Sequence, residues 1–322
     1  MLRTKLCDLL GIEAPVIQAA VAPFTSPELV AAVSNAGGLG SLGLALTPTE
    51  EFQRRLAKTQ ELTSRPFVIN YALALFNEEA FQLTLEARPA AVSFANDDPG
   101  DLVKRAHDAG LKVIHQVHTV MQARQAAERG VDIIIAQGGE AGGFGGVVAT
   151  LILVPQVIDA VHPIPVVAAG GIADGRGLAA ALALGAAGIN IGTRFLASVE
   201  SPISETWNNN IVSAQSEDAI KADVAIDIMP LPPSAYDVVP RALRTSFLEE
   251  WQHRRDDARR EAARLRSELI AGIQQGRMYE YFPFTGQTAG MIQDILPAAE
   301  IVRRLVDEAE EALAQANSLR SG

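Results

Sequence analysis

The chain is poor in cysteine and in aromatic residues. Cys7 is the single cysteine among 322 residues, so no disulfide can form within the chain, and a reducing compartment is expected. Nothing near Cys7 in the sequence would activate its thiol, and we interpret it as a small buried apolar residue. Aromatic residues make up 5% of the chain and hydrophobic residues 48%, so we expect a core of Ala, Val, Ile and Leu.

Long hydrophobic runs and an excess of positive charge are also lacking. No apolar run approaches the roughly 20 residues of a membrane-spanning helix, and the N-terminal segment, which contains Asp8 and Glu13, is unlike a signal peptide. The formal net charge is −11 and the pI is about 5.0, which argues against a general nucleic-acid-binding surface. We therefore expect a soluble, cytoplasmic protein that binds neither nucleic acid nor membranes.

Short apolar segments alternate with helical segments over the first 197 residues. Each apolar segment is followed by a helix and a short loop, which predicts a parallel sheet covered on its outer side. Eight such units favour an α/β fold of the TIM (β/α)8 barrel type over an open, doubly wound sheet, which stays the alternative. The expected strands are Pro15–Ala20, Leu39–Ala45, Pro66–Leu73, Ala90–Asn96, Lys112–His118, Asp132–Gln137, Val166–Ala169 and Ile189–Ile191.

The alternation ends after Ala197. We expect residues 198–285 to form a helical lid or substrate domain inserted after strand eight, with one long charged helix over Phe247–Gln275. Residues 1–197 and 286–322 would form the barrel, and a last amphipathic helix from Leu296 to about Ala314 would be its eighth helix. An insertion at this point projects from the catalytic face, where it can cover a site.

Glycines follow the last two expected strands. Gly170 and Gly171 end the seventh strand, and Gly192 and Thr193 end the eighth. Without side chains in the way, backbone N–H groups at these positions can approach a phosphate, and the Thr193 hydroxyl adds a donor. The alternative is that these glycines only form tight turns.

Neutral amide side chains lie near the ends of other strands. Gln18, Asn70, Gln116 and Gln137 suit a ligand with carbonyl and ring-nitrogen edges, and the glycine-rich loop 138–146 would let backbone lie flat against a planar ring. No spacing of His, Cys, Asp and Glu resembles a metal site, so no metal is expected. Neither Gly-x-Ser-x-Gly nor a dinucleotide fingerprint after the first strand is found.

Four motifs carry a family resemblance. AQGGEAGGFGG, PVVAAGGIADGRG, GTRF and the late GQTAG resemble the nitronate monooxygenase (2-nitropropane dioxygenase-like) family, which is itself similar to FMN-dependent enoyl-acyl carrier protein reductases. The resemblance covers nearly the whole chain. It implies a TIM barrel that binds FMN non-covalently, with a small helical domain over the flavin.

The resemblance also implies roles for individual residues. The phosphate would lie on Gly170, Gly171, Gly192 and Thr193, with Asn70 and Gln137 on the flavin or ribityl chain. The segment from Gln18 to Ala22 would lie under the isoalloxazine, and Gln287–Gly290 near its edge. The full expected cofactor set is Gln18, Ala19, Ala20, Asn70, Gln116, Gln137, Gly142, Gly143, Gly170, Gly171, Gly192, Thr193, Gln287, Thr288 and Gly290.

Two positions depart from the family pattern. Ala20-Val21 replaces the common Pro-Met, and Phe144 replaces the histidine that usually ends the EAGGH motif. A phenyl ring cannot exchange a proton, so acid–base chemistry at that place is lost. We expect His118 to replace it, because His118 and Gln116 share one side of their strand and an imidazole can titrate near neutrality. The alternative is that His118 caps the following helix or forms a hydrogen bond in a loop.

A cluster of aromatic residues stands near the end of the insertion. We expect Tyr281 and Phe284, with Phe144, to line a substrate pocket, and the alternative is that the cluster only packs the insertion onto the barrel.

The first function that we expect is an FMN-dependent oxidoreductase that oxidises a small nitronate or a related carbanionic substrate in the manner of a nitronate monooxygenase. The alternatives are an NAD(P)H-dependent reductase of an enoyl thioester or quinone, and a flavin-binding protein without turnover. The partners considered are a small-molecule substrate, O2 or NAD(P)H, and a second copy of the chain in a homodimer.

Overall fold

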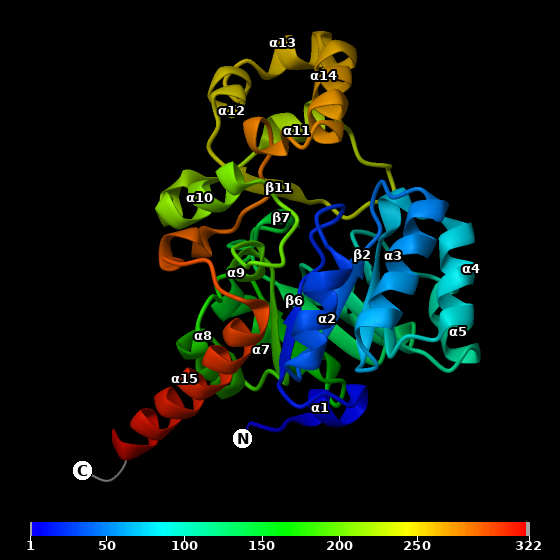
Figure 1. The fold of residues 1–322 in the computed structure, drawn as a ribbon, viewed down its shortest axis with the longest axis vertical. Coiled ribbons are helices and arrows are strands. Elements are labelled where there is room, and N and C mark those ends of the chain that lie inside the picture. Colours follow the sequence, from blue (N-terminus) through cyan, green and yellow to red (C-terminus); the bar gives the residue numbers. More distant parts are fainter. Residues whose placement is uncertain (1, 320–322) are drawn as a thin grey trace.

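Eight parallel strands form the centre of the protein, in a computed structural model that describes residues 2–319. Their order around the sheet is β1-β9-β8-β6-β5-β4-β3-β2. A parallel bridge between Ile17 and Leu39 joins β1 to the start of β2, which closes the sheet. The predicted TIM barrel is therefore confirmed (Figure 1). The strands are β1 Val16–Gln18, β2 Gly40–Gly43, β3 Phe67–Ala72, β4 Ala91–Ala95, β5 Lys112–Val117, β6 Ile133–Gln137, β8 Val166–Ala169 and β9 Gly188–Ile191.

Helices cover the outside of the barrel. Several begin at side-chain caps: Ser26, Asn77, Thr119 and Asp174 each accept a hydrogen bond from a backbone N–H in the first turn. The last helix, α15, packs against α8 and α2, and so takes the eighth position that the sequence predicts. The helices are α1 Lys5–Leu10, α2 Pro27–Asn35, α3 Thr49–Leu62, α4 Glu78–Ala87, α5 Leu102–Asp108, α6 Val120–Glu128, α7 Thr150–Val161, α8 Gly175–Ala183 and α15 Ala298–Ser318, with the 3-10 turn η1 Leu73–Leu75 before α4.

The strand side chains divide into two layers. In β5, Ile114 belongs to the cluster inside the barrel, whereas Val113 and Val117 belong to the cluster between strands and helices. This is the period-2 alternation of a strand with both faces buried. Both layers are mainly aliphatic, and at the outer ends of β3 and β4 Tyr71 and Phe94 add an aromatic contact.

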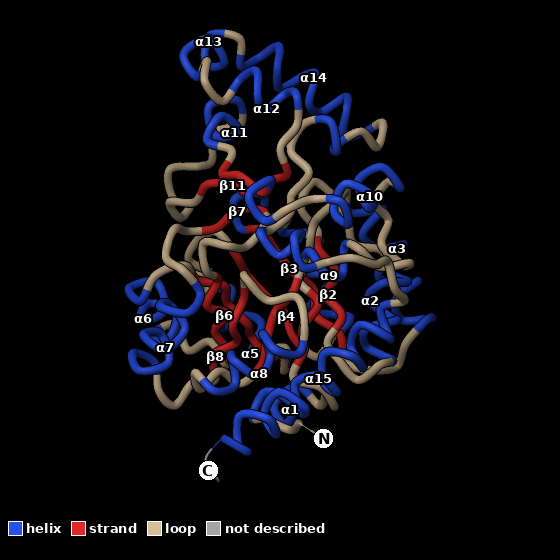
Figure 2. The backbone as a smooth tube through the Cα atoms, turned by 90° about the vertical axis from the view of Figure 1, so that its left-hand side faces the viewer, coloured by secondary structure: helices blue, strands red, loops and turns tan. Residues whose placement is uncertain are grey.

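Residues 198–285 lie over the carboxyl ends of the strands, and helices α11–α14 form the top of the molecule in Figure 1. The segment is mainly helical, and it also contains strands β10 Ala219–Lys221 and β11 Val239–Leu243. These strands form an antiparallel sheet with β7, Gly143–Gly145, between barrel and helices (Figure 2). The helices and turns of this part are α9 Thr193–Leu196, α10 Glu205–Ser213, η2 Ser216–Asp218, α11 Asp223–Ile228, α12 Ser246–Trp251, α13 Arg255–Arg260, α14 Ala262–Gln274, η3 Met278–Glu280 and η4 Gln287–Met291.

The prediction of one long helix over Phe247–Gln275 is wrong. The chain forms three helices, α12, α13 and α14, which turn back on one another. Trp251, Ala258 and Leu265 are buried in one core through these turns, and the guanidinium of Arg254 lies 4.8 Å from the Trp251 ring centroid. Burial of these apolar side chains outweighs the helix propensity of the charged residues between them.

The second core does not stop at the predicted domain boundaries. It contains Trp207, Trp251 and Tyr281 from the insertion, together with Leu196 before it and Ile292 after it. The division into residues 1–197 with 286–322 and residues 198–285 stays a prediction. No helix within residues 2–319 is long and apolar enough to cross a membrane.

Candidate active site

A cavity of about 320 Å³ lies between the carboxyl ends of the barrel strands and the insertion. Its lower part is formed by side chains inside the barrel, such as Ile114 and Ile135. Its upper wall is apolar and comes from α11, α14, η3 and the loop after α11, including Leu269, Ile273 and Met278. The cavity therefore joins the end of the barrel, where TIM-barrel sites lie, to the insertion above it.

Glycines with left-handed backbone form one side of the cavity. Gly170 and Gly171 have φ of +91° and +72°, a region that side chains disfavour. A Cβ at Gly170 would lie 3.0 Å from the Gly138 carbonyl oxygen and 3.1 Å from the Ala141 nitrogen. Both conformation and space thus favour glycine here, and bare backbone faces the cavity.

Thr193 lies beside this turn, directly after Gly192 at the end of β9, the strand that pairs with β8. Its hydroxyl oxygen accepts a hydrogen bond from the Gly286 N–H at 2.9 Å, which leaves the hydroxyl hydrogen available to donate. Gly192 and Thr193 both line the cavity. The carboxyl ends of β8 and β9 thus bring Gly170, Gly171, Gly192 and Thr193 to one side of the cavity, and their contact with a phosphate stays a prediction.

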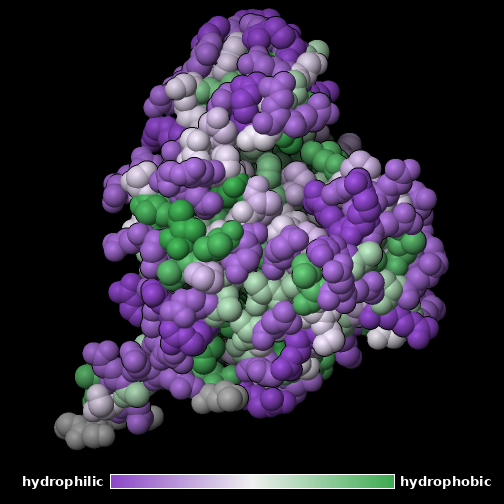
Figure 3. All heavy atoms as spheres, viewed as in Figure 1, coloured by the Kyte–Doolittle hydropathy of each residue, from purple (hydrophilic) through white to green (hydrophobic). Residues whose placement is uncertain are grey.

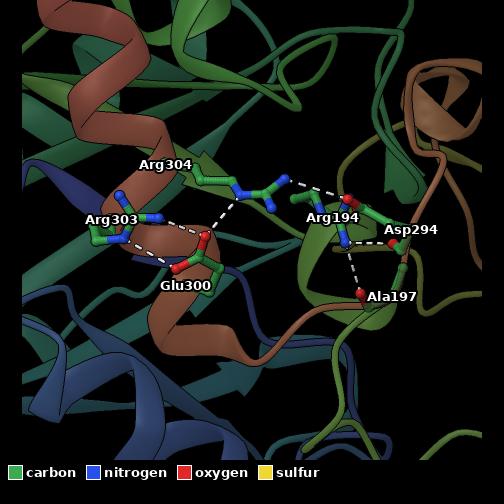
Figure 4. A network of polar contacts seen from close by, with 6 residues as sticks. All are labelled: Arg194, Ala197, Asp294, Glu300, Arg303 and Arg304. Carbon is green, nitrogen blue, oxygen red and sulfur yellow. Dashed lines mark hydrogen bonds and ion pairs between the residues drawn. The ribbon is translucent and has the colours of Figure 1, made fainter.

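An ion-pair network fixes the helix that carries Thr193 (Figure 4). Arg194 in α9 is buried and donates to the Asp294 carboxylate at 2.8 Å and to the Ala197 carbonyl at 2.8 Å. Burial lowers the pKa of Arg194, opposed by its bond to Asp294. Arg304 and Glu300 of α15 continue the network. The network ties the glycine side of the cavity to the last barrel helix.

Amide side chains line the middle of the cavity. The Asn70 amide donates to the Ser93 hydroxyl at 2.7 Å, and the Gln116 side-chain amide donates to the side-chain Oε1 of Gln137 at 3.2 Å. All of them line the cavity, with Asn190 nearby on β9. These bonds orient neutral amides toward a ligand without adding charge.

The glycine-rich loop is anchored at both ends. The Glu140 carboxylate accepts hydrogen bonds from the Thr150 N–H and hydroxyl at the start of α7, where the helix dipole favours an anion. Further along, the ammonium of Lys221 donates to the carbonyls of Gly145, Gly146 and Val239 at 2.9–3.0 Å. Burial lowers the pKa of Lys221 to about 8. The loop is thus held as strand β7, beside β11.

Phe144 lies in this strand and lines the cavity. Its ring meets Phe284 edge-to-face, with ring centroids 5.7 Å apart. The two rings form an apolar wall where the family pattern has a histidine.

The cavity wall carries no titratable side chain. Of the lining residues in the described part of the chain, none is Asp, Glu, His, Cys, Lys, Arg or Tyr. The polar groups that face it are amides, hydroxyls and backbone. The described lining residues therefore offer a bound ligand no side-chain general acid or base. Within residues 2–319, no three His, Cys, Asp or Glu side chains lie close enough together to hold a metal.

Most of the predicted site residues come together at this cavity. The ones that line it are Ala19, Ala20, Asn70, Gln116, Gln137, Gly142, Gly143, Phe144, Gly170, Gly171, Gly192, Thr193, Phe284 and Thr288. The ones that do not are Gln18, His118, Tyr281, Gln287 and Gly290. Contact of any of these residues with a flavin stays a prediction.

His118 does not occupy the position predicted for it. It follows the last residue of β5, so the strand alternation that turns Gln116 inward no longer applies, and its buried ring packs edge-on against Tyr236. Burial lowers the pKa of His118 to about 4, so it does not titrate near neutrality. The structure thus gives no support to His118 as the proton-transfer group. The neighbouring His115 forms hydrogen bonds with the Phe94 carbonyl and the Tyr236 hydroxyl.

Gln18 is held by a hydrogen bond within the barrel, and Tyr281 is held by packing within the insertion. The Gln18 side chain accepts a hydrogen bond from the Ser41 N–H at 2.9 Å, where the barrel closes. Tyr281 is buried in the insertion, edge-on to Phe247 with ring centroids 5.2 Å apart, as the packing alternative predicts. Tyr281 does not line the cavity, and its contact with a substrate stays a prediction.

Gln287 and Gly290 connect loops around the cavity. The Gln287 N–H donates to the Glu140 carbonyl at 3.0 Å, and Gly290 packs against Ser216 too closely for a side chain.

Sequence reasoning missed the upper wall. Met229–Pro232, Leu269, Ile273 and Met278 line the cavity, and nothing in their spacing distinguishes them from core residues. The sequence could have identified Asn96 as a site residue, because it is a polar residue at the end of a predicted strand. It lines the cavity, with φ of +73° and a buried Oδ1.

Comparison with known proteins supplies the family. The family model described as nitronate monooxygenase matches residues 3–80 and 72–308. The chain belongs to the nitronate monooxygenase family. This confirms the resemblance, and with it the prediction of an oxidoreductase in a family of flavoenzymes.

The relatives and the solved structure that this chain resembles have different names. It is 39% identical over 253 residues to a (3aS,4S,5R,7aS)-5-hydroxy-7a-methyl-1-oxo-octahydro-1H-indene-4-carboxyl-CoA dehydrogenase of Rhodococcus jostii, covering 78% of this chain and 69% of the relative. It is 34% identical over 271 residues to a probable nitronate monooxygenase of Staphylococcus saprophyticus, covering 69% and 76%. The solved structure of FabK from Thermotoga maritima superposes with a TM-score of 0.90 at 32% identity, covering 99% of this chain and all of that one.

Proposed function

We propose that the protein is an FMN-dependent oxidoreductase whose active site transfers electrons or hydride without an acid–base side chain of its own. The observation that carries this proposal is a cavity that combines glycine-ended strands and neutral amides with no titratable side chain among its described lining residues. We also propose that residues 198–285 act as a lid over this cavity, because their apolar side chains form its upper wall.

The residues present fit a cofactor that has one phosphate. Gly170 and Gly171 offer backbone that a Cβ would block or strain, and Gly192 and Thr193 complete the same side of the cavity. Backbone N–H groups and one hydroxyl suffice for a phosphate at such a position. Asn70, Gln116 and Gln137 would hold the ribityl chain and the ring edges, whose groups match amide donors and acceptors.

When bound, FMN would supply the electron acceptor and donor for the reaction. Phe144 and Phe284 would keep water away from one side of the substrate and offer it an apolar surface. The amides would orient neutral or delocalised polar groups, because they carry no charge.

A nitronate is the first substrate class that suits this arrangement. It has already lost its carbon-bound proton, so the missing base costs it little, and O2 would be the second substrate. A neutral nitroalkane must lose that proton first and should react slowly.

An enoyl thioester or quinone reduced at the expense of NAD(P)H is the second candidate. The observation that favours it is the extended apolar wall of Met229, Leu231, Leu269, Ile273 and Met278, which suits a substrate with an apolar body. The Rhodococcus relative is named a carboxyl-CoA dehydrogenase, and its name supports a CoA thioester as the substrate.

One set of measurements tests these proposals. The chromophore released by denaturing the purified protein should be FMN, and recovery of FAD, or of no flavin after reconstitution, would contradict the proposal. Anaerobic mixing with a nitronate, with NADH and with an enoyl thioester, followed by flavin absorbance, separates the substrate classes. A flavin that no donor reduces would mean a binding protein without turnover.

A further inference from the structure

A second hollow adjoins the cavity at the rim of the barrel. This groove, of about 320 Å³, is lined by Arg54, Arg55 and Lys58 of α3 and by Pro23, Thr25 and Ser26 of the loop that leads into α2. Pro23 lines both the groove and the cavity. The groove and the cavity therefore lie on either side of Pro23.

Two of the three basic side chains are exposed and form ion pairs with neighbouring carboxylates. Arg54 and Lys58 are four residues apart and share one face of α3. Their side chains are 76% and 43% exposed, and their partners are the nearby carboxylates of Glu51 and Glu61. Exposed pairs of this kind contribute little and exchange readily with another anion. Arg55 is less free, because it also donates to the Pro23 carbonyl at 3.2 Å and so holds the rim.

The charge of the groove contrasts with that of the chain. Three basic side chains and one acidic side chain, Glu51, line it, whereas the chain as a whole has a net charge of −11. Hydrophilic side chains also cover the upper part of α2 and α3 in the space-filling view (Figure 3). An anion repelled by most of this surface would find local attraction here.

We propose that this groove binds the phosphates of a nucleotide handle whose reactive end enters the cavity across Pro23. The shared chemistry is an adenosine diphosphate group on a long substrate. It belongs either to a coenzyme A thioester or to NAD(P)H, and the proposal rests on the second candidate function above. Arg54 and Lys58 bind the phosphates, and the apolar lid wall accommodates the other end.

Equilibrium binding of ADP tests the groove without turnover. Calorimetry on the flavin-loaded wild type should show binding that weakens as salt is raised from 0.05 to about 0.5 M. Arg54→Ala/Lys58→Ala should weaken it about tenfold, and Glu51→Gln should strengthen it by roughly threefold. Lys104→Ala is the matched control, since Lys104 is an exposed lysine with an i,i+4 carboxylate on α5, away from the groove. Equal ADP affinity in the wild type and the double variant would overturn the proposal.

Kinetics then identify the source of the handle. If it is coenzyme A, the double variant should raise the KM for a CoA thioester about tenfold. The KM for the corresponding N-acetylcysteamine thioester, which lacks the nucleotide, should not change. If it is NAD(P)H, the change appears in the KM for NADH. Flavin content should be unaffected in every variant.

The two proposals fail in different ways. If the protein binds ADP in a charge-dependent way but reduces no thioester or quinone, the proposed nucleotide site in the groove stands and the second candidate function is wrong. If the protein turns over a CoA thioester with the same KM in the wild type and the double variant, the second candidate function stands and the proposed nucleotide site is wrong.

Discussion

The two ends of the cavity are built by different means. At the barrel end, backbone and short polar side chains face the cavity from β8 and β9, and strand hydrogen bonds and the Arg194–Asp294 pair hold them in place. At the lid end, apolar side chains of α11 and α14 form the wall, and these helices are held by packing together with ion pairs of Asp227 to Arg255 and Arg259. The first kind of wall needs particular residues at each position, and the second needs only apolar volume. We infer that the barrel end fixes the cofactor and the lid end selects the substrate.

The largest effect should come from Gly171→Asp at the barrel end. Its carboxylate would face the proposed phosphate, and its Cβ would sit on a backbone with φ of +72°. We expect the purified variant to retain essentially no flavin, measured as the ratio of absorbance at 450 nm to that at 280 nm.

Gly130→Asp is the matched control for this variant. Gly130 has φ of +84° with open space around a Cβ, so the backbone strain is comparable and the cavity is untouched. It should retain flavin like the wild type. Equal flavin retention by Gly171→Asp would show that the phosphate lies elsewhere.

Phe144→His should restore the acid–base group that the cavity wall lacks. In the wild type, we expect nitronates to react about 10²–10⁴-fold faster than the neutral nitroalkanes, because general-base catalysis is worth about that much. The variant should narrow this gap and give the nitroalkane rate a dependence on pH near the pKa of an imidazole. Stopped-flow reduction of the flavin across pH 6–9 measures both. A wild type that oxidises both forms equally fast would contradict the proposed chemistry.

Sequence patterns predicted the barrel end far better than the lid end. Gly170 and Gly171 stand out because their φ of +91° and +72° favours glycine, and at Gly170 neighbouring backbone also leaves no room for a Cβ. Leu269 and Ile273 face the cavity in the same helical pattern that fills any core, so their role depends on how α12–α14 fold back, which the charged sequence obscured. The predicted orientation of His118 rested on strand alternation, which does not reach it because the strand ends at Val117.

Phe284→Ala and Tyr281→Ala should separate substrate contact from packing within the lid. Phe284 lines the cavity, so its loss should raise the KM for an apolar substrate with little change in flavin content. Tyr281 is 5% exposed and away from the cavity, so its loss should lower the free energy of unfolding by about 3 kcal/mol and leave the KM unchanged. Urea unfolding and steady-state kinetics on both variants measure the contrast. A KM change in Tyr281→Ala alone would reverse the two assignments.

The smallest effect concerns the junction between the barrel and the lid, where Tyr236 contacts both His115 and His118. Burial lowers the pKa of each histidine to about 4, whereas an exposed imidazole in the unfolded chain titrates near 6.5. Between these values the unfolded chain binds protons that the folded chain does not, so the free energy of unfolding falls as the pH is lowered from about 6.5 to 4. The loss should reach a few kcal/mol for the pair, and it is absent above pH 7, where both states are neutral. His118→Gln keeps a neutral polar side chain and should remove about one proton from this dependence, seen as a shallower slope of unfolding free energy against pH. A slope equal to that of the wild type would mean that His118 is protonated in the folded protein, and would reopen its role as a proton donor at the edge of the site.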